Sequence, residues 1–155
     1  MNFIESRARE IGAMALDGLY ERSKAISANT VNALTPGYQR RTVSFEESLR
    51  NIINRENEKD EIKMQNSIEY NMNPKKVLYG QTPEQLAFLN TEINDGFMID
   101  VEVDSSDAIG LDGNNVNIEE EMMDEAKNGM KYQVVSNLLS KNYQLLESVI
   151  KGQNS

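Results

Sequence analysis

Residues 29–38 read Asn-Thr-Val-Asn-Ala-Leu-Thr-Pro-Gly-Tyr, and this stretch decides where the first helix of the chain must stop. A helical pattern enters it but cannot pass through, because Pro36 lacks a backbone N–H and pushes the residue before it away from helical angles. Gly37 then permits a backbone conformation that other residues resist. Asn29 and Asn32 lie three residues apart on one helix face, where their amides suit a tie to the following loop or to a neighbouring chain. An ordinary helix terminator followed by a turn is the simpler interpretation of the same residues.

The residues before this stop predict one long helix over residues 2–34. Its main apolar stripe consists of Ile4, Ala8, Ile11, Ala15, Leu19, Ile26 and Ala33, with Arg22 interrupting it. A second, weaker stripe lies more than a quarter-turn away and consists of Leu16, Tyr20, Ser27, Val31 and Leu34. A surface helix of a compact monomer normally has one apolar face, so two faces favour contacts on more than one side. Burial within its own domain is the alternative, but a helix roughly 50 Å long is hard for so short a chain to surround.

The end of the chain predicts a second long helix over residues 117–152. Asn117 is the expected N-cap, with Glu120 completing a capping box, and Gly152 is the expected stop. Its apolar residues form two adjacent rows, one with Val134, Leu138, Leu145 and Val149 and the other with Val135, Leu139, Leu146 and Ile150. This broad face needs a partner, and the long N-terminal helix is the one available.

The middle of the chain is more polar, and its pattern predicts shorter elements. Ser44 to Glu47 matches a capping box before a short helix, 54–63 reads as a solvated link, and 62–79 has no clear period. Thr82-Pro83 predicts a helix start, with an end at 94–96. Residues 97–103 alternate as a strand with one solvated face, and 105–115 read as a loop.

We therefore expect a mainly α fold. The long terminal helices pair antiparallel in a coiled-coil-like manner, and a small mixed α/β polar insertion separates them. The predicted domains are 1–34 plus 117–152, a discontinuous helical domain, and 35–116, the insertion. The residues expected to make helix or subunit contacts are Ile11, Ala15, Leu19, Ile26, Val134, Leu138, Leu139, Leu145, Leu146, Val149 and Ile150.

The amino-acid composition argues against several classes of function. The chain has no Cys and no His, which removes disulfides, thiolate zinc sites, the usual general base and the commonest metal ligand. A net charge of −9 argues against nucleic acid as a partner. No apolar run approaches the ~20 residues of a membrane span, and the start has no apolar signal region. The second observation leaves the cytoplasm or export by a route that uses no cleavable signal.

The carboxylates that open the last helix were the main candidate for chemistry: Glu119, Glu120, Glu121, Asp124 and Glu125. Such a cluster could form a carboxylate metal site or an acid–base pair. Di-metal helical bundles also use His, which this chain lacks, so a solvated first turn that complements the helix dipole is the better interpretation. We expect no catalytic residue, no cofactor and no metal, and a protein that is not an enzyme.

Read together, the two ends resemble a known family. Residues 29–45 carry Asn29, Asn32, Ala33, Thr35, Pro36, Gly37, Tyr38 and Phe45, which resemble the N-terminal signature of bacterial flagellar rod and hook-type axial proteins. Residues 112–132 carry Asp112, Gly113, Asn114, Val116, Glu119, Glu121, Met122, Asn128 and Tyr132, which resemble their C-terminal signature. The short length and the Asp-Gly-Asn-x-Val arrangement favour the proximal rod (FlgB-type) group. Residues 54–110 match no motif.

The resemblance implies a structural subunit of the flagellar basal-body rod, a helical tubular assembly that transmits torque for motility. It implies export through the flagellar type III apparatus to the periplasmic rod, which fits the missing signal. The implied partners are copies of the chain itself, other rod proteins, and export-gate and rod-base adaptor proteins. Two other classes remain open: a helical adaptor or chaperone-like binding module, and a carboxylate-dependent hydrolase.

Overall fold

The computed structural model describes residues 3–72, 82–105 and 112–152 of the chain. In chain order the elements are α1 (Phe3–Val31), β1 (Arg41–Ser44), α2 (Glu46–Met72), α4 (Pro83–Leu89), β2 (Asp100–Val103) and α5 (Ile118–Lys151). The predicted fold class is confirmed, because the chain is mainly helical, its two long terminal helices pack together and a small antiparallel sheet accompanies them. The turn expected at Asn73-Pro74 and the side chain of Ile150 lie outside the described residues.

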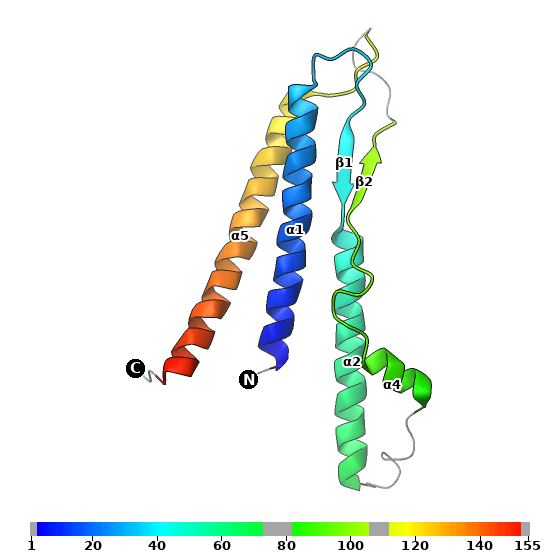
Figure 1. Cartoon of the computed structure of the whole chain (residues 1–155), viewed down its shortest axis with the longest axis vertical. Coiled ribbons are helices and arrows are strands. Elements are labelled where there is room, and N and C mark those ends of the chain that lie inside the picture. The colour runs from blue at the N-terminus through cyan, green and yellow to red at the C-terminus, as the bar shows by residue number, and fades with distance from the viewer. Residues whose placement is uncertain (1–2, 73–81, 106–111, 153–155) are drawn as a thin grey trace. The chain divides into compact units, whose positions relative to one another are not determined.

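α1 and α5 run side by side in opposite directions (Figure 1). Near the end of α1, Asn29 Nδ2 donates to Glu121 Oε2 in the first turn of α5 at 3.1 Å. Near the start of α1, the Arg9 guanidinium lies 5.8 Å from the centre of the Tyr143 ring, late in α5. This reversed order of contacts defines an antiparallel pair.

Both long helices end close to where the sequence places their ends. α1 stops at Val31, and hydrogen-bonded turns follow, including Thr35 N–H to Asn32 O at 2.9 Å and Tyr38 N–H to Thr35 O at 3.2 Å. α5 ends at Lys151, and Gly152 has a φ of 63°, as expected for a glycine that closes a helix.

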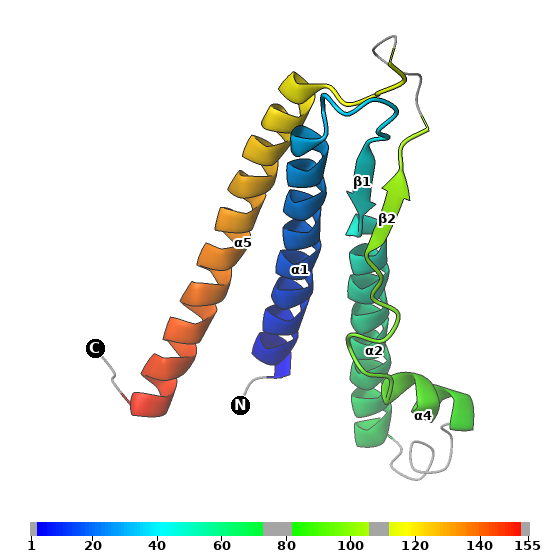
Figure 2. The same cartoon turned by 45° about the horizontal axis from the view of Figure 1, so that its top comes forward.

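The core of this helical unit lies where α1 meets α5 and β1. Its buried apolar residues are Met14, Leu19, Ala25, Ile26, Val43, Phe45 and Val116. The two helices separate toward Phe3 and Lys151, and both views show this divergence (Figures 1 and 2). The helix pair is therefore held most firmly at the end where α1 stops and α5 begins.

β1 and β2 form a two-stranded antiparallel sheet with Val43 opposite Val101. Val43 is buried, but all four residues of β2 are exposed, including Val101 and Val103. The predicted strand over 97–103 is therefore shorter than expected, and on its expected apolar side Val101 and Val103 are exposed while Phe97 and Ile99 are half-buried. The predicted cap Ser44 ends β1, because α2 begins at Glu46.

α2 continues from Glu46 to Met72, so the solvated link expected over 54–63 is wrong. Inside this helix Lys59 is buried, and its Nζ lies 2.7 Å from both Glu56 Oε1 and Thr91 O. Arg55 donates to Glu92 O, Ile93 O and Asp95 O, which fastens the turns after α4 to the helix. Charged side chains supply here the contacts that apolar residues usually make.

α4 begins as predicted, with a reciprocal capping box between Thr82 and Gln85, both hydrogen bonds being 3.2 Å long. The helix ends earlier than expected, at Leu89, and turns follow as far as Gly96, whose φ is 80°. This glycine supplies the left-handed conformation that the last turn requires.

The chain forms two compact units, Met1–Glu46 with Met98–Ser155, and Glu47–Phe97. We call the first the helix-pair unit. It contains α1, β1, β2 and α5, and therefore also 35–46 and 98–116, which the sequence analysis assigned to the insertion.

Candidate functional site

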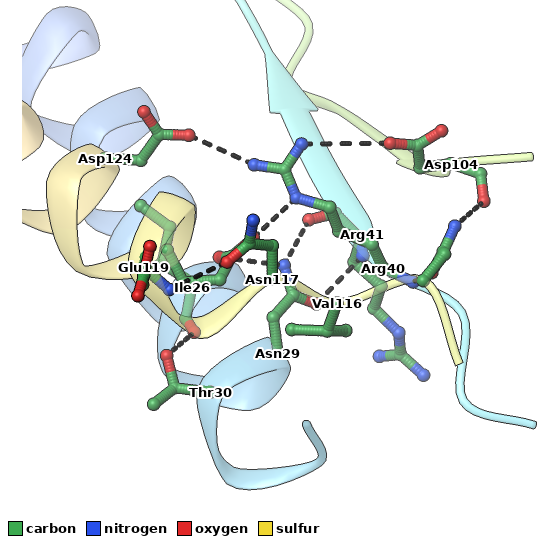
Figure 3. A network of polar contacts seen from close by, with 12 residues as sticks. Ile26, Asn29, Thr30, Arg40, Arg41, Asp104, Val116, Asn117, Glu119 and Asp124 are labelled. Carbon is green, nitrogen blue, oxygen red and sulfur yellow. Dashed lines mark hydrogen bonds and ion pairs between the residues drawn. The ribbon is translucent and has the colours of Figure 1, made fainter. Parts of the chain in front are cut away.

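The signature residues from the two ends of the chain meet where α1 stops and α5 starts (Figure 3). Five side chains connect the segments there, and we call them the junction: Asn29, Arg40, Asn114, Asn115 and Glu121. They come from α1, from the residue before β1, from the loop 112–117 and from the first turn of α5. Local sequence rules place each segment, and the hydrogen bonds below bring them together.

Asn29 is fully buried and uses both ends of its amide. Its Nδ2 donates to Arg41 O at 2.8 Å and to Glu121 Oε2 at 3.1 Å. Its Oδ1 accepts from Arg41 N–H at 2.8 Å and from the Tyr38 hydroxyl at 3.3 Å. A single side chain thus joins α1 to the start of β1 and to α5.

Glu121 is also fully buried, and Arg40 neutralises it. Arg40 Nε donates to Glu121 Oε1, and Arg40 Nη2 donates to Asp124 Oδ2 at 3.0 Å. Asp104, just after β2, lies 3.7 Å from Arg40 Nη1. Because a buried charge is costly unless it is paired, Arg40 is what allows Glu121 to be buried. The Lys127 hydrogen bond, aided by the Arg40 charge, lowers the pKa of Asp124 below its usual value.

Asn114 bonds the carbonyl groups of the turn that follows α1. Its Nδ2 lies 2.9–3.1 Å from the carbonyl oxygens of Asn32, Ala33 and Thr35. Its Oδ1 accepts from Val116 N–H at 2.7 Å, which fixes the entry into α5. This asparagine therefore ties the turn after α1 to the other end of the chain.

Two further contacts align the loops. Asn115 Oδ1 accepts from Arg40 N–H at 2.6 Å, and Asn115 Nδ2 donates to Asp104 O at 2.9 Å. Gly37, whose φ is 70°, donates its N–H to Asp112 O at 2.9 Å. Gly113 lies against it, since a Cβ on Gly113 would be 3.8 Å from the Gly37 Cα. The Thr-Pro-Gly turn and the Asp-Gly-Asn loop are therefore in direct contact.

The start of α5 is capped more simply than predicted. Asn117 Oδ1 accepts from Glu119 N–H at 3.0 Å, whereas the predicted capping box would use the N–H of Glu120. Glu119 and Glu120 are exposed, as the dipole interpretation requires, but Glu121 is not. The expectation of a solvated carboxylate cluster is therefore wrong for Glu121.

The other signature residues lie around the junction or further along the helix pair. Thr35 and Pro36 are exposed in the turn, and Met122 is exposed on α5. Asn128 is buried and donates from Nδ2 to Leu19 O at 2.8 Å, and Tyr132 is exposed.

The residues predicted to make helix or subunit contacts divide by exposure. Leu19 and Ile26 are buried, and those of intermediate exposure are Ile11, Ala15, Leu139 and Leu146. The row that consists of Val134, Leu138, Leu145 and Val149 is exposed. Only one of the two apolar rows of α5 therefore packs on α1.

The carboxylate oxygens of Glu121 are occupied by other side chains of the junction. Both oxygens of Glu121 are engaged, one by Arg40 and the other by Asn29, inside a buried network. Within residues 3–72, 82–105 and 112–152, no group of three or more His, Cys, Asp or Glu could hold a metal ion. What this geometry accomplishes is mechanical, because it fastens the two ends of the chain to each other.

Sequence reasoning missed Arg40, Asn115 and Gln39, whose Nε2 donates to Gly113 O at 3.0 Å. Residues 39–43 read Gln-Arg-Arg-Thr-Val, and nothing in this stretch indicates which acid Arg40 meets. A buried Glu in a helix signature does require a cation nearby, and that requirement is the signal that could have led to Arg40.

A second polar contact joins α1 to the end of β1. Arg22 donates to Val43 O at 2.7 and 3.1 Å and to both carboxylate oxygens of Glu46 at 2.6 Å. Its guanidinium also lies 4.8 Å from the centre of the Phe45 ring. The Arg22 hydrogen bonds are the main reason that the pKa of Glu46 falls from 4.5 to about 2.

Glu46 should therefore give the helix-pair unit an acid-sensitive contribution to stability. A lowered pKa means that the contribution is present above about pH 4.5 and is lost as the pH falls toward 2. Because this carboxylate is half exposed, we expect a loss of no more than about 1 kcal/mol. Urea unfolding between pH 5 and 2 should show a shallower pH dependence for Glu46→Gln and equally for Arg22→Gln. Wild-type slopes in both variants would contradict this assignment.

Among the described residues, no helix is long and apolar enough to cross a membrane. A comparison with protein-family models gives no match to this chain. A search of curated proteins likewise gives no significant match.

Proposed function

We propose that this protein is a structural subunit of the bacterial flagellar basal-body rod, of the proximal rod type. The observation that carries the proposal is the convergence of two separate signatures in one junction. Asn29, from the N-terminal signature, bonds Glu121 in the C-terminal signature. Asn114, from the C-terminal signature, bonds the carbonyl oxygen of Asn32 in the N-terminal signature. The signature residues thus fasten the two ends of the chain to each other. This arrangement suits a protein that assembles through its terminal helices.

The surface of the helix pair supports the same proposal. The exposed row of α5, with Leu138 and Val149 among its members, is apolar. On α1 the second stripe ends in Val31 and then Leu34, which are 82% and 87% exposed. Isolated helices gain most of their stability from packing, so these faces suit contacts with other molecules. A head-to-tail contact that does not close gives an open helical assembly.

In this proposal the protein is not an enzyme and is exported to the periplasmic rod without a cleavable signal peptide. Its partners are further copies, other rod proteins, and the export-gate and adaptor proteins at the rod base. A helical adaptor would use the same faces to bind one partner at fixed stoichiometry. Assembly into filaments distinguishes the rod subunit from the adaptor.

The test is deletion of the encoding gene, followed by motility assays and electron microscopy of basal bodies. We expect a non-motile strain without rods, and restoration of both by the intact gene. A matched complementation with Glu120→Ala, an exposed change outside the junction, should restore swimming fully. A deletion strain that still swims and builds rods would contradict the proposal.

A further inference from the structure

One side of the helix pair is hollowed along the line where α1 meets α5. Its lining includes Tyr20, Ser27 and Val31 from α1 and Met122, Ala126 and Gly129 from α5. We call this surface the groove. Glu125 lines both of its parts and accepts from the Ser23 hydroxyl at 2.9 Å, a bond that bridges the two helices where the parts adjoin. The second stripe predicted for the first helix thus forms one wall of the groove.

The other side of α5 carries a row of large apolar side chains. We call it the stripe, and it consists of Met123, Met130, Val134, Leu138, Leu145 and Val149. The steps of four and seven residues place them on one helix face. Each is between 54% and 77% exposed, which is unusual for six apolar residues on one face.

The groove and the stripe lie on different sides of the same helix. At 3.6 residues per turn, the α5 residues of the groove are roughly 150° around the helix from those of the stripe. One molecule therefore cannot fill its own groove with its own stripe. A second copy can, and the contact then leaves one free groove and one free stripe at the two ends of the pair.

The shapes of the two surfaces match. The groove has small side chains at Ser27 and Ala126, and at Gly129 no heavy atom lies within 4 Å of where a Cβ would be. Small residues let bulky ones approach, as in ridges packed into grooves between helices. The stripe supplies Leu, Val and Met side chains of the required size.

The charges match as well. The lining of the groove contains one exposed carboxylate, that of Glu125, and no Lys or Arg, since Glu121 is fully buried and is held by Arg40 and Asn29. Between the apolar members of the stripe lie three lysines, at Lys127, Lys131 and Lys141. In a pairing of stripe with stripe these lysines would face each other and the groove would remain empty. A pairing of stripe with groove brings them toward Glu125 instead.

We propose that the stripe on α5 of one copy docks into the groove of a second copy. This inference rests on the proposed function in taking the partner to be another copy, and it adds which surfaces meet. The contact is heterologous, so repetition extends the assembly in one direction.

Two variants test this directly. Leu138→Asp disables the stripe and Ala126→Arg blocks the groove, and both positions are exposed, so the fold should remain intact by circular dichroism. Wild-type protein should self-associate in sedimentation velocity at rising concentration. Each variant alone should associate at least about 30-fold more weakly, as expected for a change at the centre of an interface. Gln144→Asp, exposed on α5 outside both surfaces, should behave as wild type.

The decisive measurement is the mixture of the two variants. Ala126→Arg still has its stripe and Leu138→Asp still has its groove, so the mixture should form a discrete 1:1 dimer and nothing larger. Self-association of Ala126→Arg alone would indicate stripe–stripe pairing and overturn the inference. A monomeric mixture, or wild-type protein that stays monomeric, would also overturn it. The deletion phenotype is independent of these outcomes, so failure here is distinguishable from failure of the proposed function.

Discussion

Replacing Glu121 with alanine is expected to destabilise the helix-pair unit by about 3 kcal/mol. The substitution removes the carboxylate that accepts from Arg40 Nε and Asn29 Nδ2 in a fully buried position. Arg40 then retains Asp124 and Asp104, but the Asn29 amide loses one of its acceptors and a buried cavity remains. Because the network connects both ends of the chain, the loss should appear in all of its segments together.

Urea unfolding followed by far-UV circular dichroism measures the change, and amide hydrogen exchange locates it. Exchange should accelerate in 29–41 and in 112–121, which are far apart in the sequence. Glu120→Ala is the matched control, because it removes an exposed carboxylate from the same turn and should change stability by less than about 0.5 kcal/mol. Equal changes in stability from Glu121→Ala and Glu120→Ala would contradict the structural role assigned to Glu121.

A double-mutant cycle separates the contact between Asn29 and Glu121 from their other bonds. The sum of the single effects of Asn29→Ala and Glu121→Ala should exceed the effect of the double variant by about 1 kcal/mol, because both remove the same hydrogen bond. Full additivity would mean that the two side chains act independently. Glu121→Gln should be milder than Glu121→Ala, since it keeps the volume and one acceptor.

The ends of the main helices could be predicted because local chemistry determines them. Pro36 prevents a helix whatever the surroundings, Thr82 and Gln85 cap each other within one turn, and Gly152 takes a left-handed conformation. Each of these requires only the residues on either side. The antiparallel pairing of the terminal helices followed from their apolar faces in the same way.

The junction could not be assembled from local rules. Arg40 meets Glu121 across 81 positions of sequence, and Asn114 meets Ala33 across a similar distance. Neither pairing leaves a periodic signal, and a basic residue before a strand is ordinarily exposed. The signature residues include Asn29, Asn114 and Glu121, but the residues that they bond could be identified only in the structure.

The start of α2 matches the short helix predicted after Ser44, but its continuation through 54–63 contradicts the prediction for a different reason. Over 54–63 it has few apolar residues, so no amphipathic period identifies it. Its buried side chains there include Glu56 and Lys59, whose ion pair lies three residues apart on one face. Glu, Lys, Arg and Asn at these positions are typical of a solvated link, but Glu, Lys and Arg are also good helix formers.

Replacing Gly18 with alanine is expected to destabilise the helix-pair unit by about 1–2 kcal/mol, although alanine normally favours a helix. A Cβ at this position would lie 2.4 Å from Phe45 Cγ, far inside contact distance. Phe45 is buried, and Arg22 covers its ring from a distance of 4.8 Å while bonded to Val43 O and to Glu46. Because these contacts hold the ring in place, we expect overpacking, which costs about 1–3 kcal/mol, to outweigh the helix gain of about 1 kcal/mol.

Gly129→Ala is the matched control on the other long helix. No heavy atom lies within 4 Å of the added Cβ, so only the helix gain remains and stability should rise by about 1 kcal/mol. The change in stability of Gly12→Ala should lie between those of the other two variants. Its added Cβ would be 2.7 Å from the flexible end of the Leu139 side chain. Thermal and urea unfolding of the three variants at low concentration, where association is absent, should give opposite signs for Gly18 and Gly129. Stabilisation by Gly18→Ala would mean that Phe45 can move, and the contact of α1 with the end of β1 would then not define the position of the ring.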